Sequence, residues 1–142
     1  MRIGLEYTAL PIGRLLLSAI FIMSGIHKIM AWSETADSMT REGMVAVPLF
    51  LLGALAFEIC GGLSVLLGYW TRCGALLLIV FLVPTTVIFH DFWAYKGAEQ
   101  QMQMIHFMKN LSILGGLFFV LTSGPGPVSI DGRSNRRLEA KT

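Results

Sequence analysis

The chain has 142 residues, of which 54% are hydrophobic and only 14% are charged, whereas soluble domains carry about 25% charged residues. This composition excludes an ordinary soluble domain, and a net charge of +2 without a basic stripe argues against nucleic-acid binding. The apolar residues form four blocks, each near the roughly 17 to 25 residues that a membrane-spanning helix needs. The blocks cover residues 10–29, 47–67, 74–89 and 105–122. We therefore predict an all-α membrane protein, an up-and-down bundle of four transmembrane helices in a single domain.

The first block follows Arg2 and would also fit the outline of a signal peptide. It contains Arg14, is as long as a full span and has no clear cleavage site, so we interpret it as a retained helix. Charged groups inside hydrocarbon cost about 3 kcal/mol each and usually face the interior of a bundle. At spacings of three and four residues, one stripe of this helix carries Arg14, Ser18, Phe21, Gly25 and Lys28.

Between the first two blocks, Ser33 predicts the N-cap of a short helix that ends near Glu42 and is closed by Gly43. The methionines of this helix would rest on the membrane surface.

Glu58 lies near the middle of the second block, too deep for its short side chain to reach either interface. From the rise per residue, Arg14 and Lys109 lie close enough in depth to stretch toward it. We therefore predict a buried cluster of Arg14, Glu58 and Lys109, with Ser112 and Gly116 on the same face as Lys109. The alternative is that these charges neutralise one another and set the helix register without any chemistry.

Pro84 lies within the third block and predicts a kink, because a proline removes one backbone hydrogen bond. We expect Thr85 and Thr86 to compensate by bonding to backbone carbonyls, and a small pocket to open near the outer end of this helix.

A second predicted cluster lies at the outer ends of the helices and consists of His27, Lys28, His90, Asp91 and His106. Imidazole titrates near neutral pH, so this cluster suits proton transfer or ligand binding. Nearby methionines would also suit copper, but packing is the simpler role for them, and we predict no metal site.

Basic residues favour the cytoplasmic side of a membrane. With four spans, one side holds Arg2, Arg72, Arg133, Arg136, Arg137 and Lys141, and the other holds Lys28, Arg41 and Lys96. We therefore predict that both chain ends are cytoplasmic. Residues 124–142, which begin after an apolar block and contain Gly-Pro-Gly-Pro, are expected to form a polar, basic and largely unstructured tail.

A series of short motifs, in a fixed order from Gly13 to Asp131, resembles the DoxX family of membrane proteins. The motifs are Gly13-Arg14-Leu15-Leu16-Leu17, Ser24-Gly25 with Lys28, Glu58 with Gly61-Gly62, Gly68 with Thr71-Arg72, Phe89-His90-Asp91-Phe92-Trp93 and Met108-Lys109-Asn110.

The resemblance implies a multi-pass protein of the bacterial inner membrane, associated in some members with thiosulfate:quinone oxidoreductase or with thiol-stress complexes. It implies quinone as a ligand, with Glu58, Lys109 and His90 as polar partners. The sequence has no readable flavin, haem or iron–sulfur motif, so a partner protein would supply electrons. The alternative is a non-enzymatic scaffold, an assembly factor or a small-solute carrier, for which an oligomer would give more room.

Overall fold

The computed structural model describes residues 2–133, and within them every element is helical. Four of the helices are long and apolar enough to cross a membrane, which confirms the prediction of an all-α membrane protein. The first and last begin about two turns before the apolar blocks that predicted them. The elements are α1 (Arg2–Met30), α2 (Trp32–Arg41), α3 (Val47–Leu67), α4 (Thr71–Phe89), the 3₁₀ turn η1 (Phe92–Ala94) and α5 (Gly97–Ser123).

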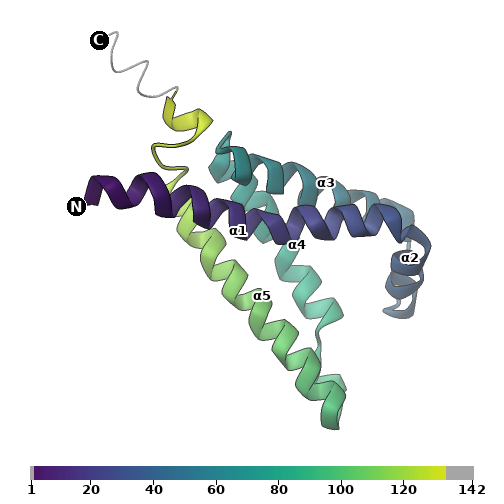
Figure 1. Cartoon of the computed structure of the whole chain (residues 1–142). Coiled ribbons are helices and arrows are strands. Elements are labelled where there is room, and N and C mark those ends of the chain that lie inside the picture. The colour runs from purple at the N-terminus through teal and green to yellow at the C-terminus, as the bar shows by residue number, and fades with distance from the viewer. Residues whose placement is uncertain (1, 134–142) are drawn as a thin grey trace.

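The long helices pack in chain order, α1 against α3, α3 against α4 and α4 against α5 (Figure 1). Contact between α1 and α5 is sparse, and Leu17 of α1 faces Gly116 of α5 where the two helices meet. Beyond that point α5 and part of α4 spread away from α1 and α3, as Figure 1 shows. We call the end of the bundle that carries α2 the α2 end, and the opposite end, with residues 68–70 between α3 and α4, the turn end.

The closest approach of α3 to α4 depends on glycine. A methyl group on Gly61 would lie 2.8 Å from Leu78 Cγ, and one on Gly74 would lie 3.1 Å from the carbonyl oxygen of Gly61 and collide with Ser64. Ser64 cannot move aside cheaply, because its hydroxyl donates to the carbonyl oxygens of Tyr69 and Trp70. Small residues thus let two membrane helices pack backbone to backbone.

Replacing Gly74 with alanine is expected to lower the free energy of unfolding by about 1 to 3 kcal/mol through overpacking. Thermal unfolding in detergent measures this loss. The matched control is Gly53→Ala on α3, where an added methyl group meets nothing within 4 Å. Equal stability of the two variants would contradict the close α3–α4 contact.

The helix α2 confirms the short helix predicted between the first two spans, but Ser33 does not cap it. The helix begins at Trp32 and follows α1 almost without a break, because Ala31 N donates to His27 O and Thr35 N donates to Ala31 O. Ala31 therefore occupies the N-cap position, and no side-chain hydrogen bond caps the helix. Met39 is buried against the protein rather than lying on the membrane surface.

Helix α4 runs as one element through Pro84, with the predicted threonine bonds in place. Thr85 Oγ1 donates to Phe81 O at 2.8 Å, and Thr86 Oγ1 donates to Leu82 O at 2.7 Å. Buried Asn110 of α5 donates to Thr86 Oγ1 at 3.1 Å and so joins the two helices.

Residues 124–133 are ordered against the turn end, and we call them the strap. Asp131 accepts hydrogen bonds from Trp70 N, Thr71 N and Thr71 Oγ1, and its own N–H donates to Gly68 O. The expectation of a largely unstructured tail is therefore wrong for this part, because the carboxylate caps the first N–H groups of α4. The rest of the predicted tail, residues 134–142, lies outside the described residues.

Candidate functional site

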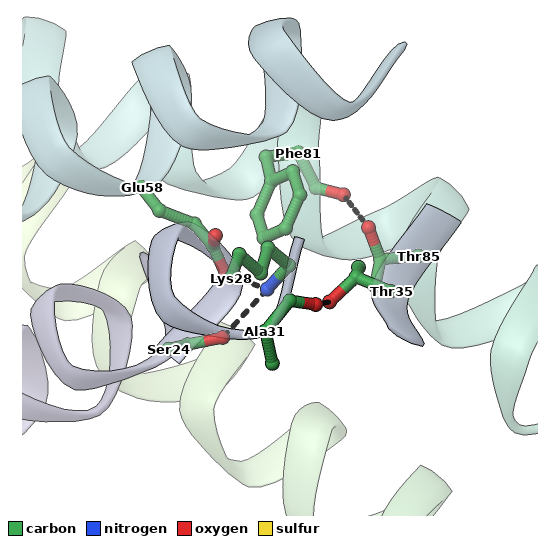
Figure 2. Close-up of polar contacts among 7 residues, drawn as sticks. All are labelled: Ser24, Lys28, Ala31, Thr35, Glu58, Phe81 and Thr85. Carbon is green, nitrogen blue, oxygen red and sulfur yellow. Dashed lines mark hydrogen bonds and ion pairs between the residues drawn. The ribbon is translucent and has the colours of Figure 1, made fainter. Parts of the chain in front are cut away.

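The partner of Glu58 is Lys28, and neither Arg14 nor Lys109. Glu58 is 2% exposed, and its Oε1 lies 2.8 Å from Lys28 Nζ, which also donates to Ser24 Oγ at 2.7 Å (Figure 2). The ammonium group lies 5.9 Å from the centre of the Phe81 ring, close enough for a cation–π contact. Three helices, α1, α3 and α4, therefore contribute to one buried polar centre.

The same stripe of α1 carries Arg14, which we predicted as a partner of Glu58, and Lys28, which is its partner and which we had placed in the outer cluster. Arg14, Ser18 and Phe21 are buried, and Gly25 packs against Ile59 of α3, so the stripe is the packed face of α1. Fourteen residues separate Arg14 from Lys28. That is about 21 Å along a helix, too far for both to reach one carboxylate.

Arg14 instead lies at the turn end, beneath the strap. It is 5% exposed and donates from Nη2 to the carbonyl oxygen of Val128. A side chain on Gly68 would collide with the guanidinium group, which shows how closely the turn covers it. Arg14 thus holds the strap.

Lys109 is exposed, because the packed face of α5 is not the predicted one. Asn110 and Leu117 are buried, whereas Lys109 and Ser112 face outward. Lys109 Nζ lies 3.4 Å from His106 Nδ1. A polar Asn110 seven residues from Leu117, within an apolar helix, was the sequence signal for the true face.

The predicted cluster of His27, Lys28, His90, Asp91 and His106 is divided between two places. The rings of His90 and His106 are stacked with centroids 5.1 Å apart, and His90 Nδ1 lies 2.9 Å from Gln103 Oε1. His27 and Lys28 lie at the α2 end, beside a cavity that neither His90 nor Asp91 lines. The spread of α4 and α5 away from α1 separates the two groups (Figure 1).

This cavity, of about 870 Å³, lies between α1, α2, α3 and α4. Its walls are mainly apolar, and it takes its few charged side chains from Lys28, Glu34 and Arg41. Residues of α3 and α4 that line it include Leu49, Phe50, Gly53, Ala54, Phe57, Val80, Phe81, Pro84, Thr85 and Ile88. We call it the α2-end cavity. Pro84 lines it, so it is the counterpart of the small pocket predicted near this proline.

The α2-end cavity has few polar groups that are free to contact a ligand. Lys28 lines it, whereas Glu58 lies behind Lys28 and does not. The hydroxyl groups of Thr35 and Thr85 are already bonded to the backbone carbonyls of Ala31 and Phe81 (Figure 2). Lys28, neutralised from behind by Glu58, is thus the charged donor that the membrane-spanning helices present to this space, whereas Glu34 and Arg41 lie on α2.

The fold and this site define a small multi-pass membrane protein with an ion pair buried beside an apolar cavity. The chain belongs to the DoxX family, whose family model matches residues 9–91. The model of the SURF4 family also matches, over residues 57–136.

Two relatives from Escherichia coli are similar over nearly their whole length. Inner membrane protein YphA is 34% identical over 87% of this chain and 89% of its own, and inner membrane protein YqjF is 36% identical over 94% and 97%. The membrane protein Rv3486 of Mycobacterium tuberculosis is 34% identical over 89% and 82%. No solved structure matches the chain. Together with the four spanning helices, these relatives identify a multi-pass protein of the inner membrane.

Proposed function

We propose that the α2-end cavity binds the headgroup of a membrane-soluble quinone and that the protein is the quinone-binding component of a membrane redox complex. The observation that carries the proposal is Lys28, a hydrogen-bond donor that lines a mainly apolar cavity. Small-molecule sites typically have about 300 to 1,000 Å³ and a few placed polar groups in apolar walls. A quinone ring with two carbonyl oxygens fits such a site.

The charge of the site favours a neutral ligand. Lys28 and Glu58 together carry no net charge, and Glu58 Oε2 has no hydrogen-bond partner among the described residues. An anionic headgroup at Lys28 would meet this carboxylate and be repelled, whereas a neutral carbonyl oxygen only accepts a hydrogen bond.

Reduction of a quinone to a quinol takes up two electrons and two protons, and the ammonium group of Lys28 can donate one of these protons to a carbonyl oxygen. The second proton and the one that restores Lys28 come from water at the α2 end. A partner protein of the complex supplies the electrons. Lys109 and His90, which the resemblance suggested as polar partners, have no part in this proposal, because neither lines the cavity.

We further place the chain ends and the turn end in the cytoplasm, because basic residues gather there. The α2-end cavity then lies near the outer face of the membrane.

Binding of quinones to the purified protein in lipid nanodiscs tests the proposal. The variant is Lys28→Met combined with Glu58→Gln, which removes the donor without leaving an unpaired buried charge. A hydrogen bond from a charged donor contributes about 1.5 to 3 kcal/mol, so binding should weaken about 10- to 150-fold. The matched control is Lys109→Met, an exposed lysine outside the cavity, which should bind as the unchanged protein does.

Absence of quinone binding by the unchanged protein would overturn the proposal. The Lys28–Glu58 pair would then be a structural device, and a scaffold or assembly role would be the better account. If the variant with both Lys28→Met and Glu58→Gln binds quinone as tightly as the unchanged protein, the ligand binds outside the α2-end cavity.

A further inference from the structure

The walls of the α2-end cavity reach the lipid-facing surface of the protein. Leu49 and Phe50 of α3 line the cavity and are 70% and 50% exposed, and Val80 of α4 also lines it and is 54% exposed. All three lie in helices that are long and apolar enough to span the membrane. A wall made of exposed, apolar, membrane-spanning residues is open to hydrocarbon rather than to water.

The opposite, aqueous end of the cavity is covered by α2. Thr35, Ser38 and Met39 of this helix line the cavity, and Met39 is buried beneath the helix. The charged residues Glu34 and Arg41 lie on the same helix and border the cavity there. Figure 1 shows α2 turning away from the ends of α1 and α3, toward the side on which α4 and α5 spread. The cavity thus has a polar cover at one end and an apolar opening at its side.

We infer that the ligand enters sideways from the bilayer, through the opening between α3 and α4, and that its apolar tail stays in that opening. The inference rests on the proposed function and specifies it: the ligand is a quinone with an isoprenoid or alkyl tail. A tail in the opening exchanges lipid contacts for equally apolar contacts, while the headgroup reaches the donor on Lys28.

Gly53 is a position on the α3 wall of the cavity at which an added side chain has room to begin. It lines the cavity on α3, and a methyl group added there would meet nothing within 4 Å. Its neighbours Leu49 and Phe50 have large side chains, so glycine is what leaves room between them and α4. A larger side chain at this position therefore begins in open space and extends from the α3 wall of the cavity.

The test is Gly53→Leu, with two probes that share a benzoquinone headgroup, one without a tail and one with a decyl tail. In nanodiscs, Gly53→Leu should weaken binding of the tailed probe about tenfold and leave that of the tail-less probe within about twofold, because only the tail meets the new side chain. The matched control is Gly115→Leu on α5, where an added methyl group also meets nothing within 4 Å and which does not line the cavity. The control should change neither affinity.

A photoreactive group at the end of the tail gives a second measurement that needs no variant. Crosslinks on the unchanged protein should map to residues 49–57 of α3 and 80–88 of α4. Crosslinks on residues 34–41 of α2, or a Gly53→Leu variant that affects both probes equally or affects neither, would overturn sideways entry. If the unchanged protein binds neither probe, the proposed function itself has failed, which is a separate outcome.

Discussion

Replacing Lys28 alone with methionine is expected to lower the free energy of unfolding by about 3 to 5 kcal/mol. Glu58 would then be a buried carboxylate without a cation, and breaking a buried pair from one side costs far more than removing both charges. The variant that also carries Glu58→Gln should recover most of the loss. Unfolding in mixed detergent micelles, followed by tryptophan fluorescence, measures all members of this double-mutant cycle.

Lys109→Met is the control for this cycle, because it removes a lysine from a membrane helix at an exposed position. It should change the free energy of unfolding by no more than about 0.5 kcal/mol. Additive losses for Lys28→Met and Glu58→Gln would contradict the pairing, since residues in direct contact are expected to be coupled.

Replacing Asp131 with alanine is expected to lower the free energy of unfolding by about 1.5 to 5 kcal/mol and to release the strap. The carboxylate caps α4, which contributes about 0.5 to 2 kcal/mol, and it satisfies the buried hydroxyl of Thr71, whose loss costs about 1 to 3 kcal/mol. Thermal unfolding measures the first effect. Limited proteolysis measures the second, because a released strap becomes a substrate for proteases.

Asp37→Ala is the matched control for the strap, since Asp37 is an exposed carboxylate on α2. It should leave both the stability and the cleavage pattern unchanged. A strap that stays resistant to protease in Asp131→Ala would show that Arg14 and the packing of the buried Ser129 hold it without the cap.

The strap also shows how a local reading of sequence can fail. Glycine and proline after an apolar helix indicate where the helix ends, and they do so correctly at Ser123. They do not show that Asp131 meets the beginning of α4, because that contact joins residues about sixty positions apart. The same holds for Arg14, whose partner Val128 lies 114 residues away in the chain.

The sequence by itself determined the four membrane-spanning helices, the short helix α2 and the packed stripe of α1. These features are local, because hydrophobicity over about 20 residues and a period of 3.6 residues are readable along one segment. It also identified Glu58 as a buried carboxylate that needs a cationic partner.

Only the tertiary structure decided that this partner is Lys28, and that a cavity lies beside the pair. Both depend on how far each helix is shifted along its axis, on its rotation, and on the angle at which it leaves its neighbours. Relative to the predicted orientation, α5 is rotated by one residue, so that Lys109 faces outward and Asn110 faces inward. These shifts and angles are set by glycine contacts such as Gly61 with Gly74, which join separate helices and leave no periodic signal in either one.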